Sequence, residues 1–211
     1  MNLSPSKENI LKKIRKALSQ STPLPFPLSE GNQPVFPALE QEPEVEFAEQ
    51  FTKLQGKFIY CINQQEFAFQ LGSLVKKQDW QKVYCVEDKL IAPAAAQLAD
   101  RLVKTDLPNC DVSITGCESL VARTGTIVMS SAQTSGRTAS VYAPIHICIA
   151  YTNQLVYDLK DALQAAKDKY GSNFPSLITF ATGPSRTADI EKTLVVGVHG
   201  PKEVYLFLIE A

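Results

Sequence analysis

Histidine is scarce in this sequence and long apolar runs are missing, and each shortage excludes a class of protein. The chain has two histidines, and its five cysteines form no C-x-x-C pair. A zinc site or an iron–sulfur cluster held by this chain alone is therefore not expected. No apolar run approaches the ~20 residues that a membrane-spanning helix needs. The net charge of −1 gives no electrostatic reason to expect nucleic acid or an anionic membrane as a partner.

The rest of the composition is that of a globular protein. The chain has 211 residues, of which 45% are apolar and 20% are charged, and this length suits one domain with an appendage. The N-terminus lacks the apolar segment and cleavage site of a signal peptide, so we expect a cytoplasmic protein. The odd cysteine count argues against a disulfide framework. Cys61, Cys85 and Cys148 lie in apolar, strand-like runs, where cysteine is usually a small buried hydrophobe.

Residues 1–44 differ in pattern from the rest of the chain. Ser4 and Pro5 can begin a helix, and the apolar residues that follow, up to Leu18, fall on one face while basic residues lie elsewhere. This pattern predicts a basic amphipathic helix, which docks either on its own domain or on a neighbouring subunit; membrane binding is the less favoured alternative. Residues 21–44 are rich in proline, which predicts an extended connector.

Residues 45–211 alternate between strand-like and helix-like segments. The expected strands are 58–62, 83–86, 112–115, 126–130, 145–150, 177–181 and 204–209. The expected helical segments are 45–54, 65–77, 89–104, a short turn at 118–122, 154–170 and 188–195. Most of the strands are continuous apolar runs, which indicates burial on both faces and a mainly parallel sheet between helical layers. No helix separates 126–130 from 145–150, so we predict a mixed sheet in a three-layer α/β/α domain.

Ligands of open α/β sheets bind at the carboxyl ends of strands, and this rule selects loops 116–123, 131–143 and 182–187. The third, Gly183-Pro184-Ser185-Arg186-Thr187, precedes a predicted helix. A helix start offers unpaired N–H groups and a positive dipole, and Arg186 adds a forked cation, so the loop resembles an anion site. The alternative is that Ser185 or Thr187 only satisfies the local backbone.

Three further stretches are candidates for the same site. Thr124-Gly125-Thr126 can form a second set of donors facing the first loop. Gly136-Arg137 brings either a cation over the site or a solvated flap. His199, in a glycine-flanked turn, is the best group for proton transfer near neutral pH, or else it fixes the turn. No arrangement of Ser/His/Asp or Cys/His indicates a nucleophile.

Several of these motifs together resemble the LUD-domain family, and more narrowly its lactate utilisation protein C group. They are Thr124-Gly125-Thr126, Gly136-Arg137, Pro144-Ile145-His146, Thr182 through Glu191, and Gly197-Val198-His199-Gly200-Pro201. The resemblance runs from about residue 45 to the end and is strongest after residue 120. The resemblance leads us to expect an acidic residue before the Thr-Gly-Thr in many relatives, whereas this chain has Arg123, so an acid–base role is not carried over to that position.

The resemblance implies a fold similar to the NagB/RpiA/CoA-transferase superfamily. It also implies a part in oxidising L-lactate to pyruvate, beside companion subunits that carry iron–sulfur clusters. The expected site combines His199 for proton transfer with a set of groups for a small organic anion: Thr124, Gly125, Thr126, Gly136, Arg137, Gly183, Ser185, Arg186 and Thr187. Two alternatives stay open. One is an independent enzyme acting on a sugar phosphate or an acyl-CoA, for which Glu118 is a weakly placed nucleophile. The other is a scaffold subunit tied to its partners, or to further copies of itself, by residues 1–44.

Overall fold

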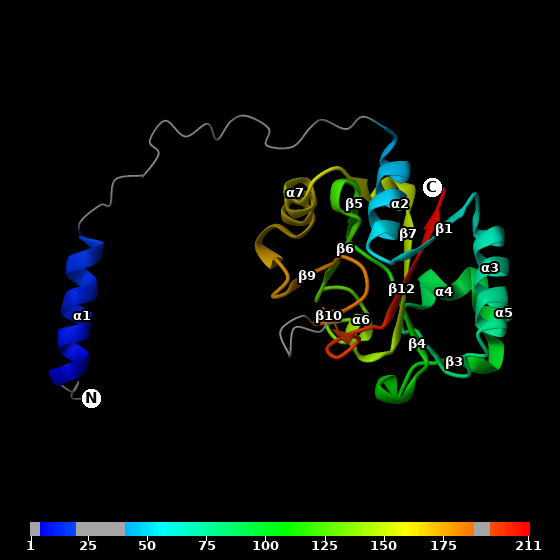
Figure 1. The fold of residues 1–211 in the computed structure, drawn as a ribbon, viewed down its shortest axis with the longest axis horizontal. Coiled ribbons are helices and arrows are strands. Elements are labelled where there is room, and N and C mark those ends of the chain that lie inside the picture. The colour runs from blue at the N-terminus through cyan, green and yellow to red at the C-terminus, as the bar shows by residue number, and fades with distance from the viewer. Residues whose placement is uncertain (1–4, 20–40, 188–194) are drawn as a thin grey trace. The chain divides into compact units, whose positions relative to one another are not determined.

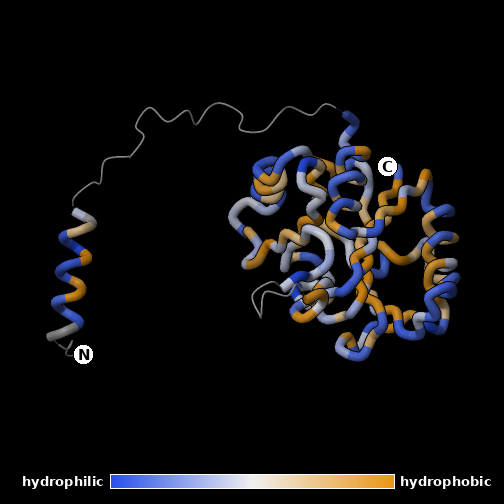
Figure 2. The backbone as a smooth tube through the Cα atoms, in the orientation of Figure 1, coloured by the Kyte–Doolittle hydropathy of each residue, from blue (hydrophilic) through white to orange (hydrophobic). Residues whose placement is uncertain are grey.

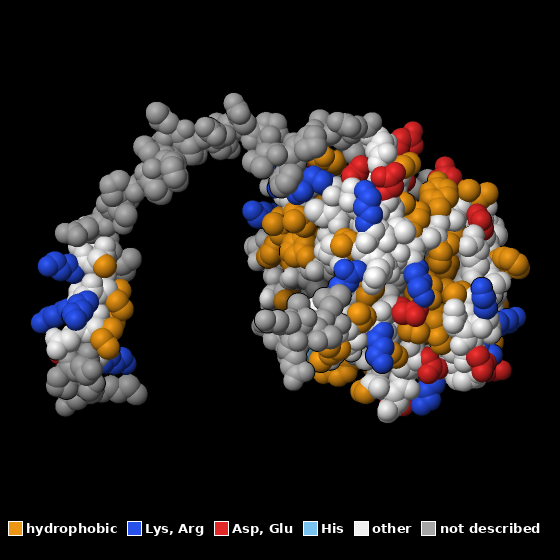
Figure 3. All heavy atoms as spheres, in the orientation of Figure 1, with side chains coloured by type: hydrophobic (Ala, Val, Ile, Leu, Met, Phe, Trp, Pro, Cys, Tyr) orange, Lys and Arg blue, Asp and Glu red, His pale blue; other side chains and the backbone are white. Residues whose placement is uncertain are grey.

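The computed structural model describes residues 5–19, 41–187 and 195–211. The chain divides into two compact units, Met1–Ala38 and Leu39–Ala211. In the first unit, helix α1 spans Pro5–Leu18, and the predicted capping residue Ser4 lies outside the described residues. Figure 3 shows apolar side chains gathered along one side of α1 and most of its lysine and arginine side chains on the opposite side. Ile10 and Ile14 are exposed, so α1 has the basic amphipathic character that the sequence predicts.

Figure 1 shows how the second unit is arranged around its strands. Its α-helices are α2 (Pro43–Lys53), α3 (Gln64–Lys77), α4 (Asp88–Ile91), α5 (Ala95–Leu98), α6 (Ala139–Tyr142) and α7 (Leu159–Tyr170). The strands of its largest sheet are, in spatial order, β1 (Lys57–Cys61), β12 (Glu203–Ile209), β7 (Ile145–Tyr151), β4 (Val112–Thr115), β2 (Val83–Tyr84) and β3 (Leu102–Val103). Every pairing in this six-stranded sheet is parallel. The predicted α/β class with a mainly parallel sheet is confirmed.

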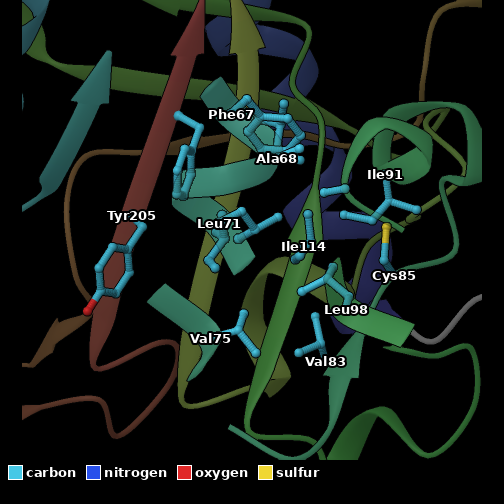
Figure 4. Packing of buried hydrophobic residues seen from close by; sticks show 14 of the residues in the cluster. Phe67, Ala68, Leu71, Val75, Val83, Cys85, Ile91, Leu98, Ile114 and Tyr205 are labelled. Atoms are coloured by element: carbon cyan, nitrogen blue, oxygen red, sulfur yellow. The ribbon is translucent and has the colours of Figure 1, made fainter. Parts of the chain in front are cut away.

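Both faces of the parallel sheet are buried, which is why its strands read as continuous apolar runs. Along β12, Tyr205 and Phe207 pack with helices α3 to α5, whereas Leu206 and Leu208 pack on the opposite face. This alternation follows from the two-residue period of a strand. Figure 4 shows Phe67 and Leu71 of α3 beside Ile114 of β4 in the first of these cores. Figure 2 shows that apolar residues are concentrated in the central strands, whereas many residues on the outer elements are hydrophilic.

A second sheet lies on the other face, and the sequence pattern does not predict it. Its strands are, in order, β8 (Leu155–Val156), β5 (Ser119–Val121), β6 (Thr126–Ser130) and β9 (Ile178–Ala181), with mixed pairing. Helix α2 shares the core between the two sheets through Phe47 and Phe51. Helix α7 packs on the second sheet through Ala162. The prediction that all strands share one sheet is therefore wrong for β6 and β9.

Three predicted elements before residue 171 differ from those observed. Segment 89–104 contains two short helices, each followed by a 3-10 turn, and then β3. Pro93 lacks a backbone N–H, and Leu102–Val103 pairs with β2, so a continuous helix does not form. The predicted turn at 118–122 is largely strand β5, paired with β6 and β8. Helix α7 begins at Leu159 rather than at 154, because Leu155–Val156 forms β8. Each difference comes from a non-local strand pairing or from a proline.

Candidate functional site

A pocket of about 360 Å³ lies where the loop after β9 meets the turn before β12. We call it the loop pocket. It is lined by Met129, Ser140, Val141, His146, the stretch Thr179 to Arg186, the stretch His199 to Pro201, and Val204. Four of the predicted residues, Gly183, Ser185, Arg186 and His199, therefore share one cavity. Arg186 and His199 lie on either side of β11 (Val195–Val196) in the sequence, and the structure places both on this cavity.

The loop pocket lies at the amino ends of the parallel strands, not at their carboxyl ends as predicted. His146 and Val204 line it, and they stand near the starts of β7 and β12. Loop 182–187 follows β9, which belongs to the second sheet. The predicted position is wrong because β9 is not a strand of the parallel sheet, so the rule for parallel sheets does not hold for the loop that follows it.

The backbone after Pro184 is extended rather than helical. Arg186–Thr187 forms β10, paired antiparallel with β11 (Val195–Val196). Most of the helix predicted at 188–195 lies outside the described residues, but Val195 is in a strand, so the prediction is wrong there. Thr187 does not line the loop pocket. The described residues of this loop, up to Thr187, therefore form turn and strand rather than a helix start, and Arg186 is the cation that they offer to an anion.

Arg186 is the charged side chain of the loop pocket. One of its Nη atoms donates a 2.5 Å hydrogen bond to the carbonyl oxygen of Leu54, the C-cap residue of α2. A guanidinium has five N–H donors, so this bond leaves donors for a ligand. Among the described residues, no aspartate or glutamate lines the pocket and no carboxylate lies within 4.0 Å of Arg186. The described part of the pocket therefore carries positive charge.

Helix α2 also explains two glycines of the predicted site. A Cβ on Gly125 would lie 2.4 Å from the backbone nitrogen of Phe51, and a Cβ on Gly183 would lie 2.7 Å from the carbonyl oxygen of Leu54. Both glycines have positive φ angles, +59° and +80°. Backbone conformation and close packing against α2 both favour glycine here. The two glycine-containing motifs are thus held against one helix.

The threonine motif reaches the pocket only indirectly. The Thr126 hydroxyl lies 2.7 Å from that of Thr124 and 2.9 Å from that of Thr182. Thr182 lines the loop pocket, whereas residues 124–126 do not. The structure therefore connects the two predicted motifs through a chain of hydroxyl groups, with Thr182 as the member that faces the cavity.

Gly136 and Arg137 lie away from the loop pocket. Arg137 is exposed, and one of its Nη atoms donates to the hydroxyl of Ser176. A Cβ on Gly136 would meet nothing within 4 Å. The same predicted loop instead contributes Ser140 and Val141, from helix α6, to the pocket wall. No sequence motif distinguishes these two residues.

The two histidines occupy contrasting positions on the wall of the loop pocket. His199 is exposed, in the turn before β12. His146 is 1% exposed, and its Nε2 lies 2.8 Å from the hydroxyl oxygen of Thr115. The Thr115 hydroxyl also lies 2.9 Å from the carbonyl oxygen of Gly116. Burial lowers the pKa of the His146 imidazole to about 4.

Because His146 is buried with a lowered pKa, we predict that the protein loses stability in mild acid. The folded pKa of His146 lies below the unfolded value of about 6.5, so the unfolded chain binds the proton more tightly as the pH falls from 6.5 towards 4. We expect the free energy of unfolding to drop by about 2 kcal/mol from this group between pH 7 and pH 5. Urea denaturation at both pH values measures the drop, and His146→Gln should remove most of it. An equal drop in the variant would contradict the assignment.

Arg123 occupies the position before Thr-Gly-Thr at which we expected an acidic residue in many relatives, and its side chain stabilises the fold. Its guanidinium forms a two-bonded ion pair with Asp158, with N–O distances of 3.0 and 3.2 Å. The hydrogen bond from Arg123 keeps the pKa of the Asp158 carboxyl below its usual range. Asp158 is the N-cap of α7. This pair therefore links the end of β5 to the start of α7.

The five cysteines are buried and free. Among the described residues, no group of three His, Cys, Asp or Glu side chains could hold a metal ion. Within the same residues, no helix has both the length and the apolarity to cross a bilayer.

The chain was compared with known families, curated proteins and solved structures. The LUD domain profile matches residues 44–209. An uncharacterised protein of Neisseria meningitidis serogroup B is 32% identical over 123 residues, which cover 58% of this chain and 52% of that protein. Lactate utilization protein C of Bacillus subtilis is 37% identical over 101 residues, 47% of this chain and 42% of that protein. The chain spans about half the length of these relatives.

A solved structure agrees with the fold. The crystal structure of a DUF162 family protein from Deinococcus radiodurans superposes with a TM-score of 0.63, at 18% identity, over 82% of this chain and 99% of that one. At that identity the likeness establishes the fold alone. The match of the family profile to residues 44–209 covers most of the chain, and the protein therefore belongs to the LUD-domain family.

Proposed function

We propose that this protein acts in lactate utilisation, as a component of the oxidation of L-lactate to pyruvate. The proposal is supported by family membership and by relatives that carry the name lactate utilization protein C in several bacteria. Companion proteins in the cytoplasm would carry the iron–sulfur clusters that accept the electrons. The chain itself would bind a small organic anion.

The loop pocket is the proposed anion site, and the charge of its lining is the observation that carries this assignment. Arg186 is its charged side chain, and no described aspartate or glutamate lines it. Arg186 would bind one carboxylate oxygen, and the hydroxyls of Ser185 and Thr182 offer further donors. A volume of about 360 Å³ is within the usual range for small-molecule sites. L-Lactate and pyruvate are small enough to enter.

His199 is proposed as the proton-transfer group. Oxidation of a 2-hydroxy acid to a 2-oxo acid releases two electrons, which the partner clusters would accept, and two protons, one of them from the hydroxyl group, so a base near that oxygen would assist the reaction. His199 lines the same pocket as Arg186.

A deletion strain of the native host tests the function in cells. We expect the strain to stop growing on L-lactate as sole carbon source while growing normally on glucose, and the intact gene should restore growth. Affinity purification of the tagged protein from lactate-grown cells should recover partners containing iron and acid-labile sulfide. Undiminished growth of the deletion strain on lactate would contradict the proposal.

A further inference from the structure

A second cavity opens at the carboxyl ends of the parallel strands, where open α/β sheets bind their ligands. It holds about 460 Å³ and lies beyond the ends of β2, β4 and β7. An adjoining hollow of about 570 Å³ shares Glu87, Leu90, Thr134 and Tyr151 with it. We call the two together the carboxyl-edge cleft. Within the described chain, no lining residue is shared with the loop pocket.

One wall of the cleft is held by a nearly buried carboxylate. The Glu118 side chain is 6% exposed. Its oxygens accept hydrogen bonds from Ser130 (2.5 Å), Tyr170 (2.6 Å) and Lys169 (2.7 Å). Burial would raise the pKa of Glu118, but these donors outweigh it and keep the pKa below its usual value. Glu118 is thus an ionised group whose oxygens are already engaged, which disfavours a role as a nucleophile.

Two further carboxylates line the cleft, Asp88 and Glu87; Asp88 is paired with Lys104 at 2.6 Å, which leaves Glu87 as the one with capacity for a ligand. Its Oε1 accepts the backbone N–H of Gly116 at 3.1 Å. Among the described residues, no cation lies within 4.0 Å of this carboxylate. Glu87 therefore presents a negative charge and an oxygen with no donor from the described residues to the cavity. A bound ammonium group would satisfy both.

Donors for an anionic group lie on the same cleft. Gln133 accepts the backbone N–H of Ser130 with its Oε1, which leaves its NH₂ group to donate. A Cβ at Gly116 would lie 3.1 Å from Oε2 of Glu87 and 3.7 Å from Nε2 of Gln133. The carboxylate and the amide thus converge above Gly116. Lys89 lines the adjoining hollow, is exposed, and pairs with no described carboxylate within 4.0 Å.

We infer that the carboxyl-edge cleft binds a small α-amino acid. Its ammonium group contacts Glu87, and its carboxylate contacts the Gln133 amide and Lys89. Leu90, Ile149 and Tyr151 line the cleft and offer surface to a short apolar side chain. A 2-hydroxy acid of the same shape is a poorer ligand here, because its hydroxyl places no positive charge against Glu87. The site is independent of the proposed anion site.

L-Alanine and L-lactate form a matched pair of probes, because they differ only in the ammonium and hydroxyl groups. Both are titrated into the ¹⁵N-labelled full-length protein, followed by NMR. We expect saturable shifts of the Gly116 backbone amide and the Gln133 side-chain amide with L-alanine. L-Lactate should bind at least tenfold more weakly at these signals. Glu87→Gln should weaken L-alanine binding about tenfold or more, the usual scale for a charge-assisted hydrogen bond.

Two controls separate this result from unfolding and from general charge effects. The amide oxygen introduced by Glu87→Gln can still accept the Gly116 N–H, so the variant is expected to fold, and its spectrum reports that directly. Glu49→Gln removes the same charge from an exposed position on α2 and should leave L-alanine affinity unchanged. The inference is overturned if L-alanine moves neither amide, if L-lactate binds there equally well, or if Glu87→Gln binds L-alanine as tightly as the parent protein.

Discussion

Gly125→Ala is expected to destabilise the protein by about 3–5 kcal/mol, placing it among the most damaging single changes. The added methyl group would lie 2.4 Å from the backbone nitrogen of Phe51 and 2.7 Å from the carbonyl carbon of Gln50. These are backbone atoms of α2, so no side-chain rotation relieves the overlap. Moving α2 away would loosen Phe47 and Phe51, both fully buried. The left-handed backbone at Gly125 adds about 1–2 kcal/mol.

Gly136→Ala is the matched control for this prediction. Gly136 has a similar φ angle, +67°, but its Cβ would meet nothing within 4 Å. We expect a cost of about 1–2 kcal/mol, from the backbone conformation alone. Urea denaturation of the two variants measures the difference. Equal destabilisation would mean that packing against α2 does not explain Gly125. Lost activity in Gly125→Ala should be ascribed to folding before it is ascribed to ligand contacts.

Arg186→Gln is expected to abolish growth on L-lactate in a complemented deletion strain while leaving the protein folded. The reason is that Arg186 supplies the positive charge of the loop pocket, whereas its structural contact is a single hydrogen bond to Leu54 from an exposed side chain. Such a bond contributes about 1 kcal/mol or less to stability. Glutamine retains an amide donor but not the charge.

Arg137→Gln serves as the comparison, because the sequence suggested both arginines for the same site. The structure places Arg137 against Ser176 and outside the loop pocket, so this variant should support normal growth on L-lactate. Immunoblots confirm equal amounts of both proteins in the cells. Normal growth with Arg186→Gln, or equal loss with Arg137→Gln, would count against the pocket as the lactate site.

The sequence predicted the parallel sheet because its strands are buried on both faces and carry an unbroken apolar signal. Val204–Ile209 is such a run, and it forms most of β12. Ser119–Val121 is too short to carry a periodicity, and its strand state depends on partners in β6 and β8. Sheet membership is likewise set by pairing between distant segments, so the second sheet could not be predicted from local patterns.

The sequence was sufficient to select several residues of the candidate site, but not to predict their contacts or which of them share a cavity. Gly183, Ser185, Arg186 and His199 were selected by residue type and turn chemistry, and they do line one cavity. The distinction between Arg186 and Arg137 depends on which neighbour each guanidinium contacts, and sequence carries no signal for that. Glu87 and Gln133, which form the proposed amino-acid site, were not among the predicted residues, because single polar residues after strands become informative only once the strand order is known.

The most direct test of the anion site is to locate bound L-lactate on the folded protein. Titration of the ¹⁵N-labelled protein with L-lactate should give saturable shifts at Gly183, Ser185 and the Arg186 side chain, and Arg186→Gln should reduce the affinity at least tenfold. Shifts confined to other surfaces, or equal affinity in the Arg186→Gln variant, would contradict the assignment of the loop pocket.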